Sequence, residues 1–294
     1  MEEKKISVAK KKKNPIMPYL LLLPPIILMG MFSFYPFIKT IVSTFSITTQ
    51  FGDFISFYGL GNWKRLFEGG KLMGTVVTTL QFAALSLTIS FIVAMFFAIF
   101  CSDKGKGSRL YQTLFGLPMV IATAPVAAIW VFIYRQHAGL LNQLLNTNIS
   151  WLKDPDTALI AVAVVTAWSH VASNYLYLLV GFRNVSDDLI EAAKIDGAGW
   201  WVRTLRIMIP MASPQIFFVF FLNIVWSLKT ITQIKLLTGG GPAGSTTTLM
   251  YSIYDKAVLR GQFEYACCEA VVLFLLIFVA TRIQFFFEKK LVHY

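Results

Sequence analysis

Long apolar stretches alternate with short polar segments along the chain, and this alternation indicates membrane-spanning helices. A helix that crosses a hydrocarbon layer of about 30 Å needs about 20 consecutive apolar residues. Six stretches reach that length, at 17–41, 74–101, 111–134, 158–180, 211–233 and 261–287. The pattern therefore predicts an all-α fold, a polytopic membrane protein with six transmembrane helices.

The first apolar stretch follows a lysine cluster at 10–13, as the apolar part of a signal peptide does. It is longer than such a segment and has no small-x-small cleavage pattern, so we expect it to remain as a span. The predicted organisation is a basic amino-terminal segment over 1–16, followed by one transmembrane domain over 17–294.

Composition and charge support this interpretation. Of the 294 residues, 56% are hydrophobic and 14% charged, which is too apolar for an ordinary soluble domain. The net charge of +11 lies in short clusters beside the apolar stretches, so no nucleic-acid partner is expected. Four basic clusters fall on one side of a six-span topology, which predicts that both termini face the cytoplasm.

One compact polar passage separates the fourth and fifth apolar stretches. Asp187 and Asp188 place negative charge where a helix begins, Ser186 precedes them as a candidate N-cap, and Gly197 can end the helix. We expect a short helix from about 187 to 196, within a cytoplasmic loop over about 181–210. An ordinary amphipathic connector between two spans is the alternative.

Polar side chains recur at helical spacing in the fourth and fifth stretches. Residues three, four and seven apart lie on one helical face, and polar groups at membrane depth cost free energy unless they pair or meet water. The two stripes favour a shared solute path, with hydrogen bonding between helices as the alternative. The predicted path residues are His170, Ser173, Asn174 and Tyr177, and then Asn223, Trp226, Lys229, Thr230 and Gln233.

The chemistry of these stripes suits a sugar, because aromatic faces stack on C–H groups while hydroxyls and amides form hydrogen bonds. Lys229 leaves two solute classes open. Near mid-depth it indicates an anionic solute, whereas near the end of the span its ammonium can extend to the membrane surface. We favour the second position, and hence a neutral sugar over a polyol phosphate.

The sequence carries no chemistry of its own that we can identify. It has no Walker A pattern, no nucleophile elbow and no cluster of zinc ligands. A Gly-rich segment, Gly239-Gly240-Gly241-Pro242, lacks the Lys and Ser or Thr of a phosphate-binding loop and falls on the extracytoplasmic side. We therefore expect no enzyme, catalytic residue, metal or cofactor, and take this segment as an external loop.

Several of these motifs together resemble a known family. The polar passage resembles the cytoplasmic loop signature of ABC importer permeases. Residues on that signature are Glu191, Ala192, Ala193, Gly197, Ile207 and Pro210, with Asp196 between them and Ile209 where Leu is usual. Segments 59–67, 107–118 and 237–249 also resemble the carbohydrate-uptake group, which includes maltose, multiple-sugar and glycerol-3-phosphate types.

This resemblance implies a type I ABC importer permease in the bacterial cytoplasmic membrane. It implies as partners a second homologous permease subunit, two ABC ATPase subunits that use ATP and Mg²⁺, an extracytoplasmic solute-binding protein and membrane lipid. The cytoplasmic loop would then couple to the ATPase, and the Gly239–Pro242 loop would face the binding protein.

Two other function classes fit the composition less well. An ion-coupled secondary transporter needs acidic residues inside its spans, and Asp and Glu are nearly absent there. A membrane enzyme acting on lipid needs a catalytic cluster at a membrane face, and the sequence provides none.

Overall fold

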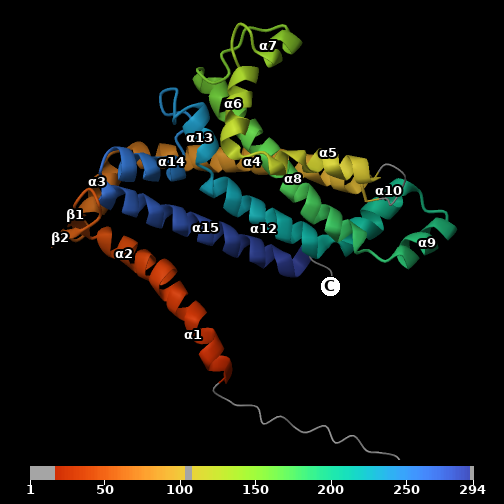
Figure 1. Cartoon of the computed structure of the whole chain (residues 1–294), viewed down its shortest axis with the longest axis horizontal. Helices are drawn as coiled ribbons and strands as arrows, with labels where there is room; N and C mark the ends of the chain where they lie inside the picture. The colour runs from red at the N-terminus through yellow and green to blue at the C-terminus, as the bar shows by residue number, and fades with distance from the viewer. Residues whose placement is uncertain (1–16, 103–107, 292–294) are drawn as a thin grey trace, which may run out of the picture.

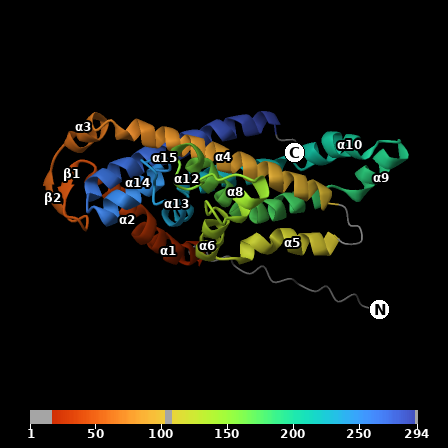
Figure 2. The ribbon, with the colours of Figure 1, turned by 90° about the horizontal axis from the view of Figure 1, so that it is seen from above.

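Four long helices form the body of the molecule. The computed structural model describes residues 17–102 and 108–291, so the predicted basic segment 1–16 lies outside the described residues. The four helices run side by side in Figures 1 and 2, with α4 packed along α8 and α12, and α12 also packed on α15. They are α4 (Lys71–Phe100), α8 (Pro155–Arg183), α12 (Ser213–Lys229) and α15 (Phe263–Leu291).

Small side chains allow these helices to pack closely. Ala94 and Ala98 of α4 are fully buried beside Tyr175 and Leu178 of α8. In membranes, where lipid is as apolar as a side chain, such close approach is what holds helices together. The body of the molecule is therefore a helix-on-helix core.

The first span lies apart from this body in its first half and packs on α15 in its second half. It is one helix from Tyr19 to Ser43, made of α1 (Met17–Met29), the π-helical turn η1 (Gly30–Phe34) and α2 (Tyr35–Ser43). None of the residues in its most apolar window is buried. Figure 1 shows α1 leading away from the bundle while α2 approaches α15. Its apolar side chains therefore face surroundings outside this chain.

Two predicted spans are broken rather than straight. The third consists of α5 (Ser108–Val120) and α6 (Thr123–Ile133), which meet at 97°. Before α12, the chain runs through α10 (Trp200–Arg203), the π-helical turn η2 (Thr204–Met208) and α11 (Ile209–Met211), then bends by 70°. Within the described ranges, four helices are long enough to cross a membrane, and up to six spans result if each bent pair is one span.

The predicted third span over 111–134 is therefore a bent pair of helices with its break in the middle. Ala122 adopts an extended backbone with ψ of 150°, and the new helix begins at Thr123 with Pro125 in its first turn. Proline is tolerated in a first helical turn, where its missing N–H has no intrahelical partner to lose, but not in a helix interior.

The remaining elements lie at the ends and along the side of the bundle. In Figures 1 and 2 the β-hairpin and α9 lie at opposite ends. The two strands are antiparallel, with Ser46 opposite Phe57. These elements are β1 (Ser46–Thr48), β2 (Phe54–Phe57), α3 (Gly61–Glu68), α7 (Leu140–Leu145), α9 (Asp187–Ile195), α13 (Thr232–Leu237), α14 (Leu249–Tyr254) and the π-helical turn η3 (Asp255–Leu259).

Candidate solute pocket and coupling segment

Two broken helices meet at an open-sided pocket of about 260 Å³. One side comes from Thr123, directly after the break between α5 and α6, and the other from the break after α12, where Thr230 is extended with ψ of 128°. Helix breaks expose backbone polar groups, which membranes tolerate where these groups are buried in protein or line a water-filled cavity. The position of the pocket therefore suits a path for a polar solute.

Five of the nine predicted path residues line this pocket, and three lining residues were not predicted. The predicted ones are His170, Trp226, Lys229, Thr230 and Gln233, and the additional ones are Thr123, Ile231 and Thr232. The additional residues follow helix breaks, which periodicity does not reveal. Pro118 and Pro125, on either side of the first break, are the available sequence signal.

One wall of the pocket is formed by an aromatic pair. The rings of His170 on α8 and Trp226 on α12 stack with centroids 5.3 Å apart and planes inclined by 14°. Hydroxyl groups of Thr123 and Thr232 and the amide of Gln233 complete the lining. An apolar face beside hydroxyl and amide groups can bind a polyhydroxylated solute by stacking and hydrogen bonding together.

Lys229 is the charged residue of this pocket. It is the last residue of α12, its side chain is exposed, and none of the residues that line the pocket is acidic. The carbonyl end of a helix carries partial negative charge and stabilises a cation there. The ammonium group is thus held beside the pocket without a carboxylate from the lining.

The predicted polar face of the fifth span is not one helical face. Helix α12 ends at Lys229, where the Thr230 hydroxyl donates to the carbonyl of Trp226 at 2.9 Å. Thr230 lies in the break, and Gln233 lies on α13. The expectation of a continuous helix to 233 is wrong because the chain turns at Thr230, and the turn itself brings Gln233 to the pocket.

Two predicted path residues instead connect helices inside the bundle. Asn174 of α8 donates its amide to the side-chain carbonyl of Asn223 at 2.9 Å, and Ser90 of α4 donates its hydroxyl to the same oxygen at 3.0 Å. Both asparagines are buried. They do not line the pocket, and their geometry matches the alternative of hydrogen bonding between α4, α8 and α12.

The other two predicted residues also lie away from the pocket. Ser173 is half-buried, and Tyr177 is exposed with its ring edge-on to Phe218 at 6.2 Å between centroids. Among the predicted residues of α8, His170 is the one in the pocket lining.

The short helix predicted between the fourth and fifth spans is present as α9. It spans Asp187–Ile195 and protrudes at one end of the bundle (Figure 1). Glu191, Ala192 and Asp196 are exposed, while Ala193 is buried. Ile195 is 86% exposed, which is unusual for a large apolar side chain on a helix outside the membrane core. This helix therefore exposes both acidic and apolar groups at one end of the bundle.

Gly197 ends this helix by its backbone conformation. The amide of Gly197 donates to the carbonyl of Lys194 at 3.1 Å, and the amide of Ala198 donates to that of Ala193 at 2.9 Å. This pair of bonds is a Schellman motif, which needs a left-handed residue at its turn. Gly197 supplies it with φ of +77°.

The entry to α9 differs from the prediction. Ser186 occupies the N-cap position, but its side chain makes no capping hydrogen bond. Asp187 and Asp188 lie in the first turn as expected, so their charges complement the helix dipole there. At the other end of the loop, Pro210 lies half-buried in α11, where the chain returns to the bundle.

The Gly-rich loop is a tightly hydrogen-bonded turn. Thr246 donates to the carbonyl of Gly241 at 2.8 Å, and Thr247 donates to that of Gly240 at 2.9 Å. Gly239 and Gly240 both have positive φ, and the Gly241–Pro242 peptide is cis. The loop follows α13, so it connects the pocket to α14.

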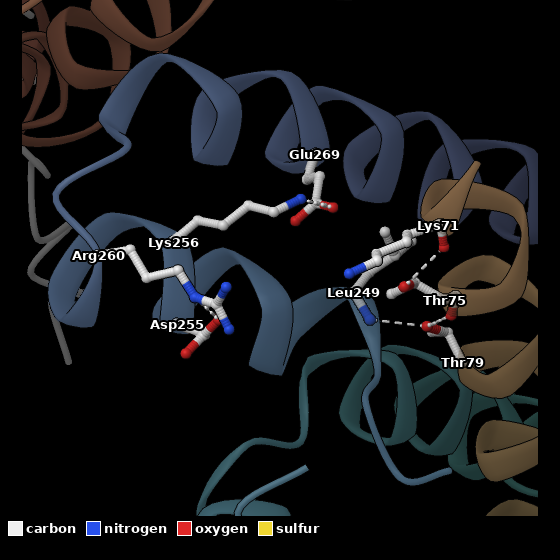
Figure 3. Close-up of polar contacts among 8 residues, drawn as sticks. All are labelled: Lys71, Thr75, Thr79, Leu249, Asp255, Lys256, Arg260 and Glu269. Carbon is white, nitrogen blue, oxygen red and sulfur yellow. Dashed lines mark hydrogen bonds and ion pairs between the residues drawn. The ribbon is translucent and has the colours of Figure 1, made fainter. Parts of the chain in front are cut away.

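Polar contacts attach the segment after this loop to two long helices. The amide of Leu249 donates to the Thr79 hydroxyl of α4 at 2.8 Å, as Figure 3 shows. In the same view Lys256 of η3 pairs with Glu269 of α15, whose side chain is 1% exposed. The segment after the loop is therefore attached to both α4 and α15.

Comparison with known proteins gives a family for the whole chain. The family model described as "Binding-protein-dependent transport system inner membrane component" matches residues 90–293. The sn-glycerol-3-phosphate transport system permease protein UgpA of Yersinia pestis is 34% identical over 282 residues, covering 95% of this chain and 96% of that protein. The UgpA protein of Agrobacterium fabrum is 30% identical over 285 residues, covering 96% and 97%.

Solved structures agree on the fold. A chain from the crystal structure of a bacterial alginate ABC transporter in complex with alginate pentasaccharide-bound periplasmic protein superposes with a TM-score of 0.81. It is 20% identical, and the match covers 93% of this chain and 94% of that chain. The broken third and fifth spans thus belong to a fold already observed in ABC transporters.

Proposed function

This chain belongs to the family of binding-protein-dependent transport system inner membrane components, and we propose that it forms the membrane path for a sugar-class solute in an ABC importer. The observation that carries the proposal is the pocket at the two helix breaks, with its His170–Trp226 wall and polar lining. Stacking on that wall accounts for recognition of a sugar ring, and the hydroxyl and amide groups account for its orientation.

A polyol phosphate is the second candidate, and Lys229 is the observation that favours it. An ammonium group beside a low-dielectric cavity attracts an anion more strongly than it does in water, whereas a neutral sugar gains a hydrogen bond alone. The relatives are named for sn-glycerol-3-phosphate transport, and a structural neighbour is described as importing the acidic polysaccharide alginate. Both names describe solutes that carry hydroxyl groups and negative charge.

Uptake by cells that lack the native gene and carry variants of it distinguishes the candidates. Trp226→Ala removes the stacking wall, so we expect uptake of labelled oligosaccharide to be lost. Lys229→Met leaves the wall intact and is expected to change that uptake only mildly. The control is Lys235→Met on α13, where the ammonium contacts the Tyr254 hydroxyl at 2.6 Å, away from the pocket lining. The contradicting result is uptake of labelled glycerol-3-phosphate that Lys229→Met abolishes and Lys235→Met does not. That result would replace the neutral sugar by the polyol phosphate as the solute.

The proposed assembly follows from the resemblance to ABC importer permeases. The sequence has no ATP-binding motif, and the resemblance implies two partner ATPase subunits that use ATP and Mg²⁺ and dock on the coupling segment around α9. A second homologous permease completes the path, and an extracytoplasmic solute-binding protein delivers the solute to the face that carries the Gly239–Pro242 loop. The chain itself contributes positioning and gating, and no catalytic residue.

The proposed orientation places both termini and α9 in the cytoplasm. Lys194 lies in the last turn of α9, Arg203 and Arg206 follow this helix, and Lys289 and Lys290 lie in the last turn of α15. Figure 1 supports this arrangement, because the last residues of α15 point toward the end of the bundle that carries α9. The β-hairpin at the opposite end is then extracytoplasmic.

A further inference from the structure

The β-hairpin carries exposed aromatic side chains that the transport mechanism does not use. Phe51, Phe54 and Phe57 are 78%, 62% and 75% exposed, and Ile55 between them is also exposed. Asp53 is the one charged residue between 46 and 57. An exposed cluster of this kind, nearly free of charge, marks an interaction surface rather than a water-facing turn.

The hairpin is fixed in position against α15. The Thr48 hydroxyl donates to Glu264 at 3.1 Å. Gly52, with φ of +82°, lies so close to Phe263 that a Cβ atom there would be 2.6 Å from the ring. The aromatic side chains are therefore presented by a rigid element, and their exposure is a property of the fold.

A groove of about 260 Å³ lies between this hairpin and α2. Ile38 and Val42 of α2 and Phe54 of β2 provide apolar walls, and Lys39 contributes a cation. Among the residues that the structure describes, no carboxylate lies within ion-pair distance of Lys39. A narrow apolar groove with one cation at its side has the chemistry of a phospholipid site, in which acyl carbons meet apolar walls and a phosphate meets the ammonium.

Continuity with the membrane-facing surface of the first span identifies the occupant. β1 begins three residues after Ser43, where the exposed apolar span ends. Lys39 is four residues before that end, or about 6 Å along the helix axis, and a lysine at that depth extends its ammonium to the headgroup layer. The hairpin therefore begins at the membrane surface and cannot lie far from it.

We propose that the hairpin and the outer end of the first span form a lipid-binding groove in the leaflet opposite α9. In this groove Lys39 binds the phosphate of an anionic phospholipid, and Phe54 and Phe57 are inserted at the boundary between headgroups and acyl chains. The proposal rests on the membrane placement of the first span and is independent of which solute the chain transports.

Spin-label accessibility tests where the hairpin lies. The full chain is reconstituted in nanodiscs of phosphatidylglycerol and phosphatidylcholine, with a nitroxide attached at Phe57→Cys. The three native cysteines are buried, and the unsubstituted chain gives their labelling background. We expect oxygen to relax the nitroxide at residue 57 and an aqueous nickel chelate to relax it little. A label at Phe32→Cys, in the exposed span, is the reference for access to oxygen. A label at Asp196→Cys is the reference for access to the chelate. A label reached by the chelate, or by neither reagent, would overturn the proposal, because it would indicate contact with water or packing against protein.

Lipid selectivity tests the role of Lys39. Spin-labelled phosphatidylglycerol and phosphatidylcholine are compared for the fraction immobilised by the protein. One lysine near an anionic surface accounts for roughly fivefold preference, so we expect Lys39→Met to reduce the preference for phosphatidylglycerol by about that factor and Lys39→Arg to retain it. The matched control is Lys71→Met, which removes an exposed lysine at the same end of the bundle and outside the groove. Equal effects of Lys39→Met and Lys71→Met would contradict a specific site. Both readouts are independent of transport, so they succeed or fail separately from the proposed function.

Discussion

At the scale of single residues, the backbone of Gly197 determines how the coupling segment is shaped. Its φ of +77° closes the Schellman motif, and a side chain at that angle costs about 1 to 2 kcal/mol, more for a β-branched residue. A Cβ atom would meet no other atom within 4 Å, so the cost is conformational rather than steric. We expect Gly197→Val to insert normally in the membrane and to lose most ATP-driven uptake.

Gly199 offers a matched control for this prediction. A Cβ atom there also meets open space, but its φ is −65°, which any residue adopts. Gly199→Val is therefore expected to transport at close to the normal rate. Uptake is measured for both variants, and immunoblots give the level of each variant in the membrane. Normal uptake in Gly197→Val, or equal losses in both variants, would show that the turn conformation does not matter for coupling.

Solute-path residues can be distinguished by their access to water. Cysteine at Thr123 or Thr232 lies in the pocket lining, so a water-soluble thiol reagent should modify it and bound solute should slow the reaction. Cysteine at Asn174 or Asn223 is buried between helices and should stay unmodified. Modification of the asparagine positions with protection by solute would restore the two-stripe path expected from the sequence.

Sequence periodicity explains why only some residues of the two stripes line the pocket. It places polar residues on a helical face correctly, as for His170 and Asn174 on α8. It cannot tell whether an asparagine meets another asparagine across a helix contact, as Asn174 does, or meets a cavity. That difference depends on the register between α8 and α12, which no spacing within one stretch encodes.

At the scale of elements, the buried ion pair between η3 and α15 holds the segment that follows the Gly-rich loop. Lys256→Met leaves the 1% exposed Glu269 carboxylate without its cation, an effect of about 3 to 5 kcal/mol on stability. Lys256→Met with Glu269→Met removes both charges, so we expect it to recover most of the loss. Thermal unfolding in detergent measures both variants.

The neighbouring pair is the control for this prediction. Arg260 pairs with Asp255 at 2.6 Å, but the arginine side chain is 63% exposed, so Arg260→Met should cost no more than about 1 kcal/mol. Equal destabilisation by Lys256→Met and Arg260→Met, or a double variant as unstable as Lys256→Met, would show that burial of this pair does not matter.

Long helices were easier to predict than helix breaks. Spans over 74–101 and 158–180 correspond to α4 and α8, because about 20 apolar residues in a row leave few alternatives. The breaks at Ala122 and Thr230 depend on one extended residue each and on neighbours from other helices. Pro125 gives a local signal for the first break, whereas residues 229–231 give none for the second.

At the scale of the whole molecule, the pocket and the coupling helix are connected through continuous elements. From α9 the chain passes through α10, η2 and α11 into α12, whose last residues line the pocket. Movement of α9 by an ATPase would therefore reach Trp226 and Lys229 through one bent segment. Such a lever suits alternating access, in which ATP binding shifts the population of inward-open and outward-open states.

Uptake by proteoliposomes tests this account most directly. The chain is reconstituted with its partner permease and its ATPase subunits, with ATP inside the vesicles, the solute-binding protein and solute outside, and no ion gradient across the membrane. We predict solute uptake that requires ATP hydrolysis and the binding protein, and that Gly197→Val abolishes while the complex stays assembled. Uptake by this chain without ATPase subunits, driven instead by an imposed proton or sodium gradient, would contradict the assignment as an ABC importer permease.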